Sequence, residues 1–167
     1  MIVEEIRVES RISKKELFRF LLYHNYCRVI GIVGLVFSVA CWIGAVWTFG
    51  NVKIGNTVLL LVLGALFTVY QPIMLYRKAV VQSRHPVFSK PASYVINDKE
   101  IVVSQGEDSA SITWNELWKV VGRKKDIYLF VDPVRANIIP KSQAGKNAER
   151  IMEVARKQMD PSQVKGK

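Results

Sequence analysis

Two long apolar stretches, residues 29–49 and 57–76, dominate the hydrophobic pattern in the first half of the chain. Neither contains a charged residue. Each is about 20 residues long, which lets an α-helix cross the roughly 30 Å hydrocarbon core of a bilayer. Residues 50–56 separate them and are too few for anything but a tight reversal. The pattern therefore predicts a transmembrane helical hairpin that returns to the side it entered from.

The first 28 residues predict a short strand followed by a helix. Residues 2–9 alternate loosely between apolar and polar positions, as in a β-strand. Ser13 and Glu16 then have the spacing of a capping box, which begins a helix. This juxtamembrane helix either lies along the membrane surface or leads straight into the first span.

After the hairpin the pattern changes from helical to β. Residues 77–92 are expected to form a linker, with Pro86 ending any helix that continues from the second span. Short intervals between strands imply antiparallel pairing, because a parallel pair needs a long crossover. A helix over 147–159 and a disordered tail over 160–167 follow the strands. The expected strands are 93–97, 101–105, 109–114, 118–122, 127–131 and 136–139.

The predicted fold class is an α+β membrane protein. Six strands and a terminal helix make a domain over 93–159, and the N-terminal strand raises the count to seven. Seven antiparallel strands with a C-terminal helix are the architecture of a small pleckstrin-homology-like (PH-like) barrel. The hypothesis requires the hairpin, residues 29–76, to be inserted between the first and second strands, so that the N-terminal strand pairs with the C-terminal sheet.

Small residues recur on one helix face of the first span and, more weakly, of the second. Such residues let two helices approach closely in lipid. Two interpretations stay open: the faces pack against each other within the hairpin, or they form a surface for dimerisation or for a partner. The candidate helix-packing residues are Gly31, Gly34, Ser38, Ala45, Gly64 and Thr68.

The net charge of +10 is unevenly placed. Basic residues flank both spans, whereas the connecting loop contains Lys53 alone, and this bias places both termini in the cytoplasm. Contact with anionic lipid or a partner is one interpretation of the basic positions, and a solvated surface is the other. The candidates are Lys14, Lys15, Arg77, Lys78 and the turn Arg123, Lys124 and Lys125, which Lys119, Lys141 and Lys146 could extend.

The sequence offers little catalytic chemistry. His24 and His85 lie near the ends of the two spans without a neighbouring thiolate or carboxylate, which makes a poor metal site. No Gly-rich phosphate loop, His-Glu-x-x-His or Gly-x-Ser-x-Gly motif occurs. We expect no catalytic residue, cofactor, metal or bound nucleic acid.

Three segments of the C-terminal half carry a family resemblance. They are residues 112–120 (ITWNELWKV), 127–130 (IYLF) and 138–141 (IIPK). Together with the order of spans and strands, they resemble the YcxB-like family of bacterial membrane proteins. Residues 142–145 (SQAG) depart from the basic and then aromatic residue expected there. The resemblance implies residence in the bacterial cytoplasmic membrane and a PH-like domain, and it implies no reaction.

Two classes of function remain. In the first, the chain is a non-enzymatic, membrane-anchored protein whose cytoplasmic domain is an interaction or regulatory module. Its partners would then be the bilayer, anionic headgroups and a protein partner or a second copy of the chain. In the alternative, the hairpin acts in immunity against a membrane-active peptide or as a transport accessory.

Overall fold

The fold comes from a computed structural model that describes residues 5–166. The chain forms two compact units. One contains Met1–Glu16 together with Ser83–Lys167, and the other contains Leu17–Gln82. The second unit therefore interrupts the first in the sequence.

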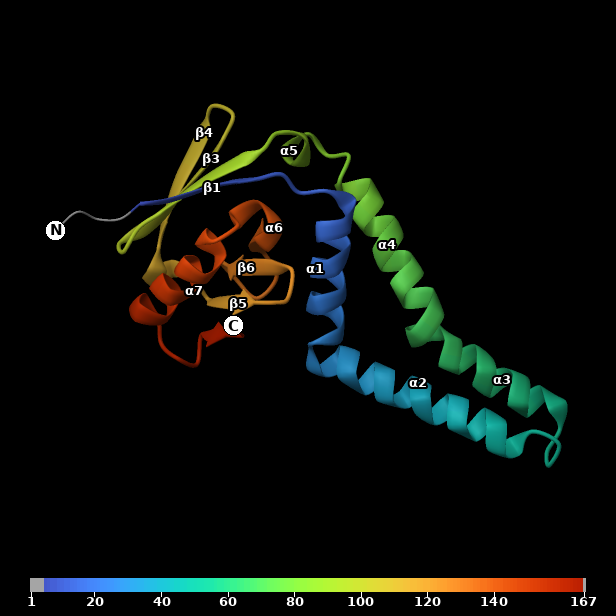
Figure 1. The fold of residues 1–167 in the computed structure, drawn as a ribbon. Helices are drawn as coiled ribbons and strands as arrows, with labels where there is room; N and C mark the ends of the chain where they lie inside the picture. Colours follow the sequence, from blue (N-terminus) through green and yellow to red (C-terminus); the bar gives the residue numbers. More distant parts are fainter. Residues whose placement is uncertain (1–4, 167) are drawn as a thin grey trace. The chain divides into compact units, whose positions relative to one another are not determined.

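The first four strands of the mixed unit form one antiparallel sheet in the order β1-β2-β3-β4 (Figure 1). Strand β1 pairs with β2 from Ile6↔Ile96 to Ser10↔Ala92, although the whole helical unit lies between them in the chain. This pairing confirms that the N-terminal strand joins the C-terminal sheet. The predicted strand began at residue 2, and residues 2–4 lie outside the described part. The strands are β1 (Ile6–Ser10), β2 (Ala92–Ile96), β3 (Glu100–Gln105) and β4 (Asp108–Thr113).

A second sheet has the order β7-β6-β5-β8. Strands β5 (Lys119–Gly122), β6 (Asp126–Phe130) and β7 (Ala136–Pro140) pair antiparallel, as expected. Strand β8 (Val164–Lys165) adds a parallel edge to β5. The expectation of a disordered tail over 160–167 is therefore wrong for these residues. The tail is held by backbone pairing, including a 2.9 Å bond from the Val120 N–H to the Gln163 carbonyl.

The core of this unit lies between the sheets and the C-terminal helix α7 (Asn147–Gln158). Helix α7 buries the apolar side of its sequence, including Ile151 and Met152. Trp114 starts a short 3-10 turn, η2 (Trp114–Glu116), and is buried, with its indole N–H bonded to the Asn97 carbonyl. A further short helix, α6 (Lys141–Ala144), directly follows β7.

The two sheets do not close into the predicted barrel. Strand β1 approaches β7, and the Ser10 hydroxyl donates to the Ile138 carbonyl at 3.0 Å. Strand pairing between β1 and β7 does not continue beyond this bond, because the Gln143 side chain of α6 hydrogen-bonds both the backbone N–H and the backbone carbonyl of Arg11. Its Oε1 accepts from the Arg11 N–H at 2.6 Å, and its Nε2 donates to the Arg11 carbonyl at 2.9 Å. The fold is thus a mixture of helices and two open sheets.

Helices make up the second unit (Figure 1). A turn at Cys27 and Arg28 interrupts the helix, so α1 does not lead straight into α2. α3, the π-helix η1 and α4 form one continuous helix over Ile54–Gln82, which includes six residues of the predicted linker. α2 and this second helix are both long and apolar enough to cross a membrane. The elements are α1 (Lys14–Tyr26), α2 (Val29–Thr48), α3 (Ile54–Ala65), η1 (Leu66–Tyr70) and α4 (Gln71–Gln82); α5 (Pro86–Ser89) follows in the mixed unit.

Candidate functional site

The small residues of α2 form its buried face, which lies against the end of α1 at Gly31, beside Asn25, and against the returning helix at Gly34, beside Phe67. The side chains that α2 buries are Gly31, Gly34, Ser38, Cys41 and Ala45. A Cβ atom at Gly34 would lie 2.3 Å from Cε1 of Phe67, so glycine is what allows the ring to pack there. On the opposite side, a Cβ at Gly64 would lie 3.1 Å from Cδ1 of Trp42.

Hydroxyl groups line the same face beside the π-helix. The Gly64 carbonyl accepts from the hydroxyls of Ser38 and Thr68, the latter at 2.7 Å. Thr68 in turn accepts from the indole N–H of Trp42 at 3.2 Å. Of the candidate packing residues, Ser38, Gly64 and Thr68 thus lie in one polar cluster, and Trp42 belongs to it.

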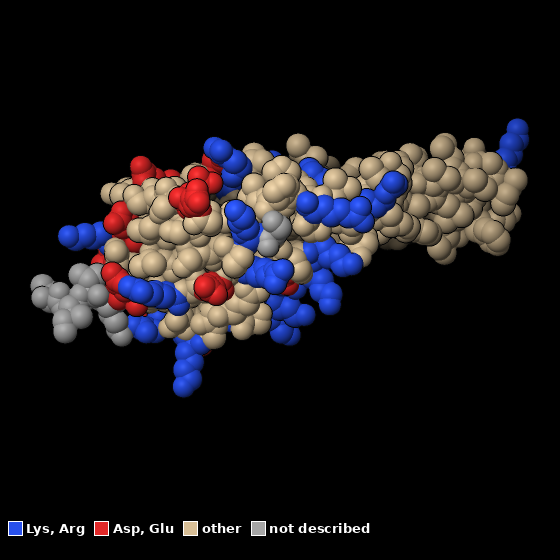
Figure 2. All heavy atoms as spheres, turned by 90° about the horizontal axis from the view of Figure 1, so that it is seen from above, with Lys and Arg blue, Asp and Glu red and all other residues tan. Residues whose placement is uncertain are grey.

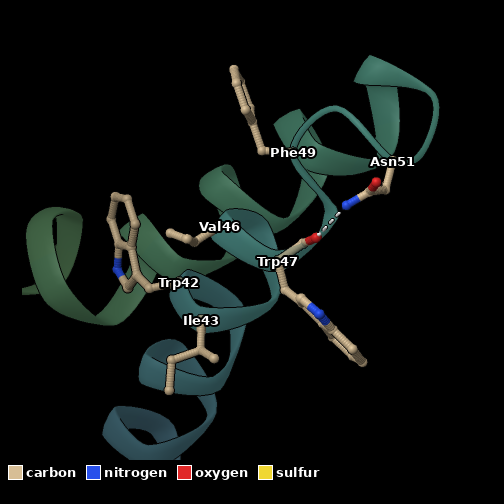
Figure 3. A pocket seen from close by; sticks show the side chains of 6 residues that line it. All are labelled: Trp42, Ile43, Val46, Trp47, Phe49 and Asn51. Carbon is tan, nitrogen blue, oxygen red and sulfur yellow. Dashed lines mark hydrogen bonds between the residues drawn. The ribbon is translucent and has the colours of Figure 1, made fainter.

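The outward surface of the hairpin is apolar and exposed. Large apolar side chains on both helices are more than a third exposed, and Trp47 reaches 82 %. Near the tip, Trp42, Ile43, Val46, Trp47 and Phe49 border an open apolar hollow (Figure 3). Asn51 closes it, with its amide bonded to the Trp47 carbonyl at 3.2 Å. On the face that Figure 2 shows, the outer part of the hairpin has no charged atoms except at its tip.

The basic turn lies at one end of the second sheet. Gly122, Arg123 and Lys124 line a hollow there together with Lys141, the first residue of α6, which directly follows β7. Lys125 is exposed but does not line it. The structure therefore brings Lys141 to two of the three predicted turn residues.

The other basic candidates lie elsewhere. Lys119 places its Nζ 4.3 Å from the centre of the Trp118 ring and 4.7 Å from that of Phe130. Exposed Lys14 and Lys15 lie in the first turn of α1. Arg77 and Lys78 are exposed on α4, in the helical unit.

Acidic side chains organise turns of the domain. Asp132 accepts backbone N–H bonds from Val134 and Arg135, both at 2.7 Å, and a bond from the Arg135 guanidinium. These bonds lower the pKa of Asp132 to about 2. Glu116 completes a capping box by accepting from the N–H and hydroxyl of Thr113, which lowers its pKa too. Both carboxylates thus serve local structure.

Residues with catalytic or metal-binding chemistry are dispersed over the described chain. Over residues 5–166, no three His, Cys, Asp or Glu side chains gather as metal ligands would. His85 instead caps α5, with Nδ1 accepting from the Val87 N–H at 3.4 Å. Cys27 is exposed, Cys41 is buried, and both are free thiols.

Sequence reasoning missed the π-helix and the bond that Tyr26 makes to the Phe67 carbonyl beside it. Pro72 was the available signal: a proline two residues after Tyr70 disturbs the helical ladder just before it.

No curated protein and no solved structure matches the chain. A family model matches the mixed unit from the end of β2 to α7, and its boundaries enclose both the basic hollow and the buried Trp114. Residues 96–154 match the family described as YcxB-like protein, which confirms for this domain the resemblance found in its sequence.

Proposed function

We propose that this chain is a non-enzymatic, membrane-anchored protein whose domain is a PH-like interaction or regulatory module at the inner face of the bacterial cytoplasmic membrane. The hairpin would be the anchor, with both termini in the cytoplasm. The observation that carries the proposal is the insertion of an exposed apolar hairpin between two paired strands, β1 and β2.

The insertion supports a single side for both ends of the hairpin. β1 and β2 are joined by backbone hydrogen bonds, so the segments that leave and re-enter the mixed unit belong to one folded domain. An even number of spans returns the chain to its starting side. The flanking basic residues favour the cytoplasm for that side.

The surface of the hairpin supports insertion in lipid. Soluble monomers rarely expose contiguous apolar patches beyond a few hundred Å². Here exposed Val, Ile, Leu, Phe and Trp side chains continue along both helices. The polar groups of the hairpin, such as Ser38 and Thr68, instead bond to backbone carbonyls between the helices. That arrangement suits a medium without water.

The strand count supports a PH-like domain. β1–β7 form two antiparallel groups, and α7 covers the core between the sheets. An interaction module also fits β4, which is an edge strand of the first sheet and has mostly exposed residues. Such an edge strand can receive an extended partner segment.

Cysteine accessibility in whole cells tests the topology. Asn51→Cys and Ser162→Cys are introduced singly after Cys27 and Cys41 are replaced by alanine. A membrane-impermeant maleimide should label position 51 from outside the cell and position 162 only in inverted vesicles. Labelling of position 162 from outside would overturn the topology.

A hairpin exchange separates the module from the alternative function. Residues 29–76 are replaced by an unrelated two-span hairpin, and a photo-crosslinking residue is placed at Ser111 on β4 or at Val46 on α2. A module should give the same Ser111 crosslink in both proteins. If crosslinks arise only at Val46 and only with the native hairpin, the activity resides in the hairpin and the module proposal fails.

A further inference from the structure

Strand β4 forms one edge of the first sheet, and half of its backbone groups point away from β3. In an antiparallel pair, successive residues turn their N–H and C=O groups alternately toward the partner strand and away from it. Two bonds fix this alternation. The Thr113 N–H donates to the Glu116 carboxylate at 2.7 Å instead of to β3. Glu100 pairs with Thr113, and its carbonyl accepts from the Asn97 N–H at 3.1 Å, on the β2 side. Residue 113 and every second residue before it therefore face outward.

Ser109 and Ser111 thus present unpaired N–H and C=O groups along the edge. Over residues 5–166, β4 pairs with β3 alone, and both serines are exposed, as is Ala110 between them. An unpaired sheet edge is a template for another strand, and proteins block it with lysine, proline or a bulge. β4 contains neither Lys nor Pro, and it pairs with β3 over six successive residues without a bulge. The edge is therefore open to an added strand.

The surroundings of this edge are acidic, although the chain as a whole is basic. Residues 100–118 contain four acidic residues and no Lys or Arg, whereas the whole chain has a net charge of +10. The Lys90 ammonium approaches the β3–β4 turn, 3.2 Å from where a Cβ of Gly106 would stand, and offsets part of the charge there. Carboxylates stand at both ends of β4, with Glu107 and Asp108 at the hairpin turn and Glu100 and Glu116 at the other end.

A second copy of the chain does not suit this edge. Antiparallel pairing of Ser109 with Ser111 of the other copy would place Glu107 opposite Thr113, whose N–H holds the Glu116 carboxylate. The same opposition would recur at the other end by symmetry. Like charges directly opposite on paired strands are destabilising. The charge of the edge therefore favours a basic partner over a second copy.

We propose that the β4 edge binds an extended segment of another protein that carries Lys or Arg at both ends. Backbone hydrogen bonds to Ser109 and Ser111 hold the segment, and its basic ends meet the carboxylates that flank the edge. Cytoplasmic segments beside membrane spans carry an excess of Lys and Arg, so such segments occur at the inner membrane face. The inference rests on the proposed function and deepens it, because it gives the chemistry of the partner.

A synthetic peptide, Lys-Thr-Val-Thr-Val-Thr-Lys with blocked termini, provides the probe. Its β-branched centre favours an extended chain. The peptide is titrated into the full chain in an uncharged detergent, and amide hydrogen exchange is followed by NMR. Exchange of the Ser109 and Ser111 amides should slow at least about fivefold at saturation, because these N–H groups gain partners. The Ala110 amide faces β3 already and should change by less than about twofold.

Paired variants separate a defined edge from a general attraction. Glu107→Gln combined with Asp108→Asn removes two charges beside the edge, and Glu149→Gln combined with Glu153→Gln removes two exposed charges from α7. The first pair should weaken binding about fivefold and the second less than about twofold, because salt screens distant charges. Ser111→Pro removes an outward N–H that β3 does not use, and it should weaken binding at least about tenfold. Dispersed spectra of each variant verify that it folds.

Two altered peptides test the edge from the side of the partner, with the native chain. A peptide with Glu at both ends should bind at least about tenfold more weakly, and one with N-methyl groups on its central amides should not bind. Equal binding of the acidic peptide overturns the proposal. Slow exchange of the Ser109 and Ser111 amides before any peptide is added also overturns it and assigns the edge to a second copy.

The hairpin exchange distinguishes failure of this inference from failure of the proposed function. If the basic peptide does not slow exchange at Ser109 and Ser111 while the crosslink from position 111 persists in both proteins, the module stands and the basic segment is wrong. If that crosslink is absent as well, both proposals fail.

Discussion

The hydroxyl of Tyr26 donates a hydrogen bond to the carbonyl oxygen of Phe67, 41 residues later in the chain. This carbonyl lacks its helical partner for a definable reason. The N–H of Gln71, which an α-helix would supply, bonds to Leu66 in the π-helix. The next residue is Pro72, which has no N–H to donate. Tyr26 therefore satisfies a backbone acceptor that the helix leaves open.

Tyr26→Phe should destabilise the helical unit by about 0.5–2 kcal/mol, because it leaves a carbonyl unpaired in an apolar setting. The measurement is reversible unfolding of the full chain in mixed micelles with increasing sodium dodecyl sulfate. Tyr70→Phe removes a hydroxyl from an exposed ring, 58 % accessible, and should have little effect.

A double-mutant cycle with Pro72→Ala tests the cause. Alanine restores an N–H five residues after Phe67, so the cost of Tyr26→Phe should shrink in that background. An equal cost in both backgrounds would mean that Tyr26 acts through something other than the open carbonyl.

Gly34→Ala should weaken the packing of α2 on the returning helix. Its Cβ would collide with the Phe67 ring, whereas a Cβ at Gly44 would meet only Leu60 at an ordinary 3.5 Å. Both changes gain about 1 kcal/mol of helix propensity, so their difference isolates the collision, which typically costs about 1–3 kcal/mol. The same unfolding titration gives this difference.

The oligomeric state of the Gly34→Ala variant decides between the two interpretations of the small-residue face. Packing within the hairpin predicts lower stability at an unchanged mass by light scattering, and partial rescue by Phe67→Ala. If the variant instead keeps its stability and loses a dimer, the face lies between copies.

The sequence predicts the parts of this fold that have a local period. Residues 29–49 indicate a helix by apolar length, and the strands after residue 92 are indicated by alternation and turn residues. β8 could not be predicted because a strand of two residues shows no alternation in the sequence. Its pairing with β5 also depends on where α7 ends. The prediction of a closed barrel was wrong because Gln143 binds the Arg11 backbone. That contact joins residues 132 positions apart, which no local sequence pattern indicates.

The candidate site divides in the same way. Arg123, Lys124 and Lys125 stand together in the sequence, so the basic turn is visible there. Which of them line the hollow depends on the β6–β7 register. This register pairs Asp126 with Pro140 and so places Lys141 beside the turn. The sequence pattern thus indicates the positive charge of the turn, whereas the hollow follows only from the β6–β7 register.

Asp132 should make the stability of the domain depend on acidity between about pH 4 and pH 2. Its pKa is lowered to about 2 from 3.8, chiefly by bonds from Arg135. A lowered folded-state pKa contributes stability that is present above the unfolded value and is lost as the pH falls through the folded value. Asp132→Asn should therefore flatten thermal stability over this interval. Glu107→Gln, an exposed change in the β3–β4 turn, should retain the wild-type slope.

Gly166→Ala should release the β8 edge from the second sheet. Gly166 has φ +86°, and a Cβ there would lie 2.0 Å from the Gly122 carbonyl oxygen. Its own carbonyl accepts from Arg156 at 3.1 Å, which further fixes its position. Loss of the edge should raise the hydrogen-exchange rate of the Val120 amide, the donor to Gln163, by at least about tenfold. Gly145→Ala imposes similar left-handed strain at φ +56° but meets no atom within 4 Å. It should leave the Val120 rate unchanged, and equal acceleration in both variants would show that strain alone, rather than the contact with Gly122, governs the edge.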